Sequence, residues 1–146
     1  MEYCPGGDLF NLISCQREAK LKKTGENPAI ILKCKNVQFY GACILLAIDY
    51  LHKNKIIFKD LKLENIIISK EGFPKLTDFG LSSCLDQDWI AETEPDFHAK
   101  SVTLSISSPE VLDTNSFSEA SDWWSFGCLL YEMTVGKKPF DGLSFF

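Results

Sequence analysis

The stretch that decides the fold is Phe58-Lys59-Asp60-Leu61-Lys62-Leu63-Glu64-Asn65, which follows the apolar pair Ile56-Ile57. The apolar residues predict the end of a buried strand, and the charged residues after them predict a loop. In that loop the Asp60 carboxylate can accept a proton from a hydroxyl group, and the Asn65 amide oxygen can ligate Mg²⁺. The Lys62 ammonium group can neutralise charge that develops on a transferred phosphoryl group. These are the side chains that phosphoryl transfer requires.

Three further motifs follow the loop in a fixed order. They are Asp78-Phe79-Gly80, Ser108-Pro109-Glu110 and Asp122-Trp123-Trp124-Ser125-Phe126-Gly127. A charged loop alone is more often a solvated turn than a catalytic site, but four motifs in one order argue against an accidental match. With these motifs the chain resembles the carboxy-terminal lobe of a eukaryotic protein kinase, most nearly the AGC group of serine/threonine kinases.

The resemblance implies an α+β fold, a mostly helical carboxy-terminal lobe with a small β-hairpin at the catalytic loop. Residues 1–146 would form a partial kinase domain that runs from the hinge between the lobes to the helix after the activation segment, with the amino-terminal lobe absent. A short helix is expected from Asp8 to about Ile13. Residues 14–36 are polar and rich in lysine, and we expect an insertion that forms a solvated loop. A docking role for this insertion is the alternative.

Three later segments have clear patterns. Apolar residues at helical spacing predict a long helix over about 37–54. Residues 66–68 and 75–77 flank a turn and predict a hairpin that supports the catalytic loop at one end and Asp78 at the other. Residues 122–135 predict a helix that is apolar on nearly every side and must therefore be buried, with Gly136 as its C-cap.

The resemblance also implies a role for each residue of the active site. Asp60 orients the substrate hydroxyl and accepts its proton, and Lys62 contacts the γ-phosphate of ATP. Thr103 braces both residues. The metal ligands for Mg²⁺ are Asn65 and Asp78. The nucleotide is met by Glu2, Cys4 and Asp8, with Met1 at the gatekeeper position of the hinge.

Protein substrates are expected to carry basic residues upstream of the phosphorylated hydroxyl. The acids that match substrate-reading positions are Asp8, Glu64 and Glu132, and the alternative for each is plain surface solvation. Asp122 matches the structural residue that hydrogen-bonds the backbone of the catalytic loop. Glu110 normally pairs with an arginine beyond this segment, so we expect an unpaired buried carboxylate here, which is costly.

Several residues depart from the family pattern. Phe58 and Lys59 stand where histidine and arginine are usual, and lysine cannot form the bidentate fork that arginine offers to a phosphate. Ala99 stands at the activating threonine, so we expect activation without phosphorylation there. Val102 replaces a glycine and Ser108 an alanine. The acids expected to substitute in part for the missing phosphate are Asp86, Asp88, Glu92, Glu94 and Asp96.

Composition limits the remaining possibilities. The chain has 146 residues, of which 45% are hydrophobic, and this suffices for one compact domain. A formal net charge of −5 argues against nucleic acids and anionic membranes as partners. No apolar run is long enough to span a bilayer, and no signal peptide opens the chain, so we expect the cytoplasm or the nucleus. The six cysteines lack a C-x-x-C pair and predict reduced thiols, and His52 is expected to be structural.

Two functions remain open from the sequence. The first is a serine/threonine kinase that transfers the γ-phosphoryl group of ATP, with Mg²⁺, to protein hydroxyls. The second is a non-catalytic kinase-like scaffold or a truncated gene product, favoured by Lys59, Ala99 and Val102. A small helical binding module does not account for the ordered motifs. We expect the 146 residues alone to be inactive, because the glycine-rich phosphate loop and strand lysine of the amino-terminal lobe are not among them.

Overall fold

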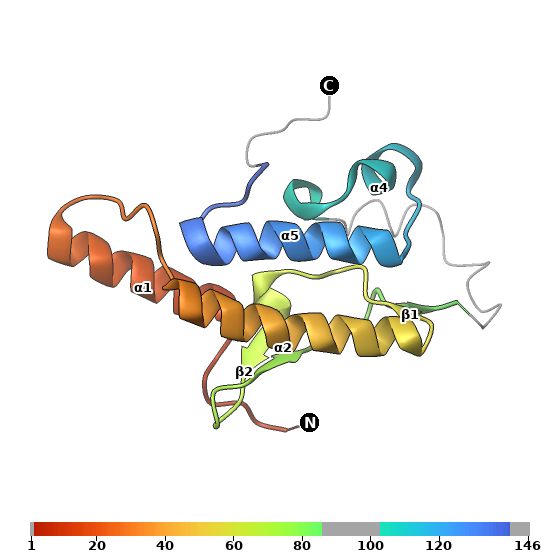
Figure 1. Ribbon diagram of the computed structural model, residues 1–146, viewed down its shortest axis with the longest axis horizontal. Coiled ribbons are helices and arrows are strands. Elements are labelled where there is room, and N and C mark those ends of the chain that lie inside the picture. Colours follow the sequence, from red (N-terminus) through yellow and green to blue (C-terminus); the bar gives the residue numbers. More distant parts are fainter. Residues whose placement is uncertain (1, 86–102, 141–146) are drawn as a thin grey trace.

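The computed structural model describes residues 2–85 and 103–140 (Figure 1). The helices in these residues are α1 (Leu9–Thr24), α2 (Cys34–Lys53), α4 (Pro109–Thr114) and α5 (Glu119–Val135). The strands are β1 (Ile56–Ile57), β2 (Ile66–Ile68), β3 (Pro74–Leu76) and β4 (Ser83–Cys84), and the 3₁₀ turns are η1 (Leu63–Asn65) and η2 (Leu104–Ile106). The α+β prediction is therefore confirmed.

Helix α1 begins at a side-chain cap and is longer than predicted. Asp8 accepts a hydrogen bond from the Asn11 backbone N–H at 2.7 Å, which satisfies a donor of the first turn. The prediction that the helix ends near Ile13 is wrong. Residues 14–24 contain no glycine or proline and are rich in helix-forming side chains, so the helix continues to Gly25, whose positive φ of 75° closes it.

The segment between α1 and α2 is not simply a solvated loop. The side chains of Ile31 and Leu32 are fully buried and belong to the hydrophobic core. The Ile31 backbone N–H donates to the Thr134 carbonyl oxygen at 2.7 Å, and the Lys20 ammonium group donates to the carbonyl oxygens of residues 30 and 31. The expectation of a solvated loop over 14–36 is therefore wrong. Residues 14–24 are helical, and Ile31 and Leu32 belong to the core. Its status as an insertion stays a prediction.

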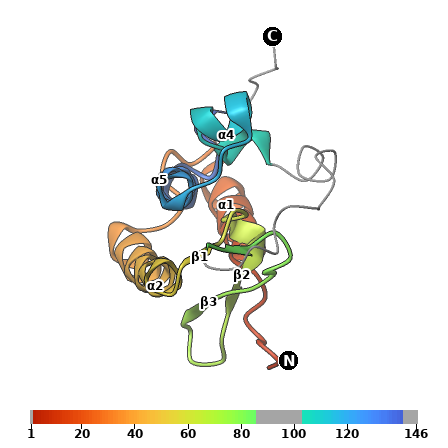
Figure 2. The same cartoon turned by 90° about the vertical axis from the view of Figure 1, so that its right-hand side faces the viewer.

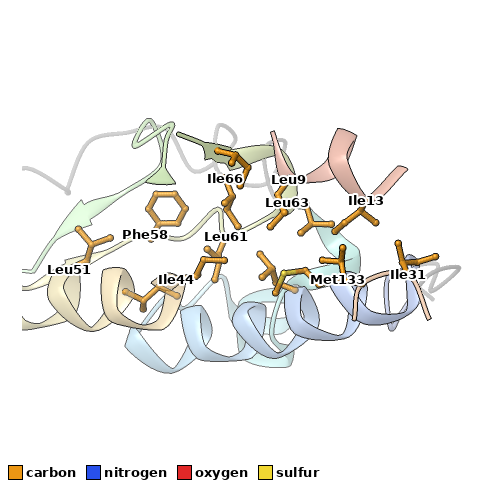
Figure 3. Packing of buried hydrophobic residues seen from close by; sticks show 14 residues of the cluster. Leu9, Ile13, Ile31, Ile44, Leu51, Phe58, Leu61, Leu63, Ile66 and Met133 are labelled. Carbon is orange, nitrogen blue, oxygen red and sulfur yellow. The ribbon is translucent and has the colours of Figure 1, made fainter. Parts of the chain in front are cut away.

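Helices α2 and α5 lie side by side and enclose the core of the lobe (Figures 1 and 2). The predicted helical periodicity of α2 is confirmed, because Ile44, Ile48 and Leu51 are buried on one face. Figure 3 shows the loop residues Leu61 and Leu63 reaching into the space bordered by these helices and α1. The fully buried loop side chains explain why the loop has a fixed position in the fold.

Helix α5 has the predicted C-cap, but it begins at Glu119, three residues before the predicted start, and its burial differs from the prediction. Ser118 and Ser121 form a reciprocal capping box at its start, and Gly136 closes it with a φ of 72°. The expectation that nearly every side is buried is wrong. The exposed fractions of Trp123, Trp124 and Tyr131 are 37%, 38% and 46%. The buried face carries Leu129 and Met133 together with polar side chains.

Two small antiparallel sheets hold the loop ends. Strands β2 and β3 form the predicted hairpin, with Ile66 opposite Leu76, and β1 pairs with β4. The hinge segment adds to β2, since Gly6 N–H donates to the Ile68 carbonyl oxygen at 3.2 Å and Ile68 N–H donates to the Gly7 carbonyl oxygen at 2.8 Å. Backbone approach is so close there that a Cβ on Gly6 would lie 2.7 Å from Ile68 atoms. All six cysteines are free, and no helix among the described residues is long and apolar enough to cross a membrane.

Candidate active site

The Asp60 carboxylate is the centre of the candidate site. Its side chain is 7% exposed, in the loop between β1 and η1. The Lys62 ammonium group donates to Oδ2 at 2.6 Å, and the Asn65 amide nitrogen donates to Oδ2 at 2.8 Å and to the Asp60 carbonyl oxygen at 2.9 Å. No described residue donates a hydrogen bond to the other carboxylate oxygen. The carboxylate is therefore fixed through one oxygen and available through the other.

The loop backbone before Asp60 is held in a conformation that a non-glycine residue rarely adopts. Lys59 has a φ of 69°. Such a backbone persists only when its surroundings fix it. Asp122 of α5 does so, because its carboxylate accepts from the backbone N–H groups of Phe58 and Lys59, both at 2.9 Å. This is the contact that the resemblance implied for Asp122.

Asp122 is itself buried and fully engaged. Its side chain is 1% exposed, and its Oδ2 lies 2.8 Å from His52 Nε2 of α2. The His52 ring in turn makes an edge-to-face contact with Trp123, with ring centroids 5.3 Å apart. A buried carboxylate is stable only when it is paired and hydrogen-bonded, and Asp122 has three partners. His52 is thus a structural partner of Asp122.

Asp78 lies next to the loop at the end of β3. The backbone N–H of its neighbour Thr77 donates to the Asn65 carbonyl oxygen at 3.0 Å, which joins the two segments. Asp78 has a φ of 61° and an exposed side chain, and its Oδ1 accepts from the Gly80 N–H at 3.2 Å. The Phe79 ring contacts the Phe58 ring edge to face at 5.2 Å. The second motif is therefore attached to the loop by backbone and by ring contact.

The donor set of this corner fits a hard divalent cation. Both nitrogen-bound hydrogens of Asn65 point to Asp60, and no described residue donates to the Asn65 amide oxygen. An amide oxygen and an exposed carboxylate on adjoining segments are oxygen ligands of the kind that Mg²⁺ takes, usually together with phosphate oxygens and water. Asn65 and Asp78 could therefore hold Mg²⁺ bound to a nucleotide.

The hinge residues are tied to the strand that leads to Asp78. The Glu2 carboxylate accepts from the Lys75 ammonium group of β3 at 2.7 and 2.8 Å. This hydrogen bond raises the pKa of Lys75. Cys4 is half-buried, and both carboxylate oxygens of Asp8 are engaged by Asn11 at 2.7 Å in capping α1. The hinge segment therefore lies beside the hairpin. Its partner Lys75 is three positions before the candidate metal ligand Asp78 in the sequence.

Comparison with known families decides what this arrangement is. A model of the protein kinase domain matches residues 1–144 of the chain. The chain belongs to the protein kinase domain family.

The relatives of this kinase domain agree with the predicted resemblance to AGC-group serine/threonine kinases. The cAMP-dependent protein kinase type 3 of Saccharomyces cerevisiae is 39% identical over 141 residues, which cover 96% of this chain and 30% of that protein. Protein kinase C-like 1 of the same yeast is 37% identical over 142 residues, or 97% of this chain and 11% of that protein. The RAC-beta serine/threonine-protein kinase of Rattus norvegicus is 38% identical over 142 residues, or 96% of this chain and 25% of that protein. The chain thus spans between 11% and 30% of the length of these relatives.

Two of the predicted residues of the kinase domain, Glu132 and Glu110, have surroundings that the sequence did not indicate. Glu132 is buried, with an exposed fraction of 7%, so the alternative of a solvated surface acid is wrong for it, whereas Glu64 is exposed. Glu110 is also exposed, and the expectation of a costly buried carboxylate is wrong. The substrate-reading role of Asp8, Glu64 and Glu132 stays a prediction.

The predicted contact of Thr103 with Asp60 and Lys62 is not seen among the described residues. The carbonyl oxygen of Thr103 accepts from the Ile106 N–H at 3.1 Å and from the Ser107 hydroxyl at 3.0 Å. Its bracing role stays a prediction. Met1, the acidic cluster over 86–96 and the positions of Ala99 and Val102 lie outside the described residues.

Sequence reasoning missed two residues that support the catalytic loop of the kinase domain. The Ser82 hydroxyl donates to the Phe58 carbonyl oxygen at 3.1 Å, and the Lys59 ammonium group lies 5.1 Å from the centre of the Phe117 ring. No sequence signal points to Ser82. The sequence signal that could have pointed to Phe117 is Lys59. A lysine in place of the usual arginine cannot make the same bidentate contacts, so its ammonium group needs a different partner.

Proposed function

We propose that the protein that carries this chain is a serine/threonine protein kinase, which transfers the γ-phosphoryl group of ATP to hydroxyl groups of proteins. The observation that carries the proposal is the hydrogen bonding of the Asp60 carboxylate. One of its carboxylate oxygens is held by Lys62 and Asn65, and no described residue donates to the other. A carboxylate fixed in this way orients a substrate hydroxyl with its second oxygen and accepts the proton as the oxygen attacks phosphorus.

Charge neutralisation is the second requirement of the reaction, and two groups of the chain serve it. Lys62 lies 2.6 Å from Asp60, so its ammonium group is adjacent to the point where the phosphoryl group arrives. Asn65 and Asp78 would hold Mg²⁺ on the nucleotide. When bound, the metal supplies a positive charge that stabilises the charge developing on phosphate oxygens. Lys62, two positions after Asp60, also supports serine and threonine over tyrosine as the acceptor, by resemblance.

A non-catalytic scaffold is the second candidate, because Lys59 replaces an arginine of the family pattern. A scaffold needs a stable lobe but has no physical requirement for the network of Asp60, Lys62 and Asn65. Placing a carboxylate that is 7% exposed beside an ammonium group costs desolvation energy, which a structure-only role does not repay. The network therefore supports the enzyme.

Substrates with basic residues upstream of the acceptor hydroxyl are part of the proposal. The support is the exposed Glu64 carboxylate, four residues after Asp60 in the chain, and the net charge of −5. Opposite charges steer association and set the register of a bound peptide. The partner class is thus proteins with basic segments rather than nucleic acids. The test is the E64Q variant, which should raise KM for a basic peptide and leave KM for a neutral peptide unchanged.

The experiment that tests the function uses the full-length product of the gene that encodes this chain. Transfer from γ-labelled ATP to a serine peptide with upstream arginines is measured for the wild type and for D60N. The D60N variant should lose a factor of about a hundred or more in kcat, which is the usual contribution of a general base. The matched control is D113N, an exposed acid of α4, which should keep wild-type activity. Equal activity of D60N and the wild type, or no transfer by the wild type, would count for the scaffold.

We also propose that the protein works in the cytoplasm or the nucleus. The support is the cysteine chemistry, because six free thiols suit a reducing compartment. A fluorescent fusion of the full-length product tests this location. The 146 residues alone should not transfer phosphate, since they contain no glycine-rich phosphate loop. Transfer by the isolated segment in the same peptide assay would contradict that expectation.

A further inference from the structure

Lys59 occupies an unusual position beside the central carboxylate of the site. It immediately precedes Asp60, its φ is 69°, and its backbone N–H is held by Asp122 at 2.9 Å. Its side chain is half-buried and extends to Phe117, where the ammonium nitrogen lies 5.1 Å from the ring centre. This distance is within the range of a cation–π contact, which is about 6 Å.

Phe117 belongs to the same segment that anchors the Lys59 backbone. It lies between α4 and α5, one residue before the N-cap Ser118 and five residues before Asp122. Lys59 is therefore held twice by one short stretch of chain, by a carboxylate at its backbone and by an aromatic ring at its side chain. A residue that is held at its backbone and at its side chain by one stretch of the protein cannot change its φ and ψ angles freely without breaking one of these contacts.

The electrostatics of this contact are those of a cation that has partly left water. Burial lowers the pKa of the Lys59 ammonium group, and the Asp122 carboxylate opposes this effect. Among the described residues, no carboxylate lies within ion-pair distance of the Lys59 nitrogen. The electron-rich face of an aromatic ring attracts a cation, and the attraction grows as water is removed. The ring thus adds to the stabilisation of the charged form that the Asp122 carboxylate provides.

We propose that Phe117 is a positioning residue for Asp60, which acts by holding the charged side chain of Lys59. The inference rests on the proposed kinase activity. Turning the Lys59 side chain away from the ring would remove one of the two contacts that hold this residue at its positive φ, and the Asp60 carboxylate that follows it would lose its orientation toward the acceptor hydroxyl. Only the charged ammonium group is held by the ring, so the positioning is lost when Lys59 is deprotonated.

The test uses paired variants in the full-length protein. F117L removes the aromatic face and keeps an apolar side chain, whereas F117Y keeps the face. K59M removes the charge and keeps the length, whereas K59R keeps the charge. The matched control is F73L, which makes the same substitution at a half-exposed ring of the hairpin turn, 51% exposed and outside the site. For each variant, kcat and KM for ATP and for a basic peptide are measured across pH, and the melting temperature is recorded.

The expected results separate positioning from plain structural support. F117L and K59M should each lower kcat by about three- to tenfold with little change in either KM, and the double variant should be no worse than either single one. F117Y, K59R and F73L should keep kcat. Equal kcat for F117L and the wild type, or additive losses in the double variant, would overturn the inference while leaving the kinase function intact. No transfer by the wild type would overturn both.

The pH profile gives a second and independent readout. The titratable groups that face Lys59 are Asp122 of α5 and, through it, His52 of α2. Deprotonation of Lys59 should lower kcat on the alkaline side. F117L should move this alkaline limb to lower pH, and K59R should remove it. A structural role of Phe117 alone would lower the melting temperature and leave the limb in place.

Discussion

Replacement of Asp122 tests whether α5 holds the catalytic loop in the way its contacts indicate. The D122A variant removes three hydrogen bonds, two from backbone N–H groups at 2.9 Å and one from His52 at 2.8 Å. The side chain is 1% exposed, and its removal would leave the buried Phe58 donor and the half-buried Lys59 donor unsatisfied. Each such donor costs about 1–3 kcal/mol. We expect a loss of about 2–6 kcal/mol of unfolding free energy, a large share of the usual 5–15 kcal/mol for a domain.

A loss of that size can prevent folding, so D122N is the variant that keeps the experiment informative. The amide keeps one oxygen acceptor but turns a donor toward one of the three partners, and we expect a loss of about 2 kcal/mol. Unfolding of the full-length protein by urea is followed by tryptophan fluorescence, since Trp123 lies against the His52 ring. The control is D49N, which breaks an exposed pair with Lys53 and should change stability by about 0.5 kcal/mol or less. Equal effects of D122N and D49N would refute the anchoring role.

Three further predictions follow from single contacts. Ser108 is 1% exposed and its hydroxyl has no partner among the described residues, so S108A should be neutral or stabilise by about 1 kcal/mol in urea unfolding, and a clear loss would contradict this. Gly136 has a φ of 72° and a Cβ there would lie 2.6 Å from Ile31, so G136A should cost about 1–3 kcal/mol in the same assay; a neutral result would mean that the αL cap carries no strain. Glu2 raises the pKa of Lys75, so the pair stabilises the fold below the ordinary lysine pKa and loses this effect as pH rises through the raised value. E2Q should lower the pKa of Lys75 in an NMR titration, and an unchanged titration would rule the pair out as the cause.

Local chemistry made the hairpin and the end of helix α5 predictable. Ser69 to Gly72 is a turn sequence between two apolar runs, and the strands form on either side of it. Gly136 ends α5 because a glycine at positive φ closes a helix at little cost. Features of this kind depend on a few neighbouring residues, and a sequence displays them directly. The convergence of Asp60 and Asn65 is also local, since five positions separate them.

The path of residues 14–36 was not predictable from the same signals. Residues 14–24 are mostly exposed, so they lack the apolar stripe by which helices are recognised, and only the absence of a breaker before Gly25 indicated the helix. Residues 29–32 are a short apolar run in an otherwise polar stretch, and within it Ile31 and Leu32 are buried whereas Ile30 is 57% exposed. The Ile31 backbone N–H donates to the Thr134 carbonyl oxygen, more than a hundred positions away. The run could indicate burial, but a contact of that range and the partner it involves cannot be read from the local sequence.

The burial of α5 shows how the polar residues of a helix can carry more information than its apolar ones. The residues that are buried follow a helical stripe: Ser121, Asp122, Ser125, Cys128, Leu129, Glu132 and Met133. Burial was predicted from the large aromatic residues of the helix, but Trp123, Trp124 and Tyr131 are partly exposed. The polar side chains face inward because irregular segments there offer backbone groups without helix or strand partners. Asp122 accepts from the catalytic loop, and the Ser125 hydroxyl donates to the Ile106 carbonyl oxygen at 3.0 Å. A helix that supports loops must therefore bury polar residues at helical spacing. That spacing, read from Asp122 through Ser125 to Glu132, would have predicted the burial of Glu132 from the sequence alone.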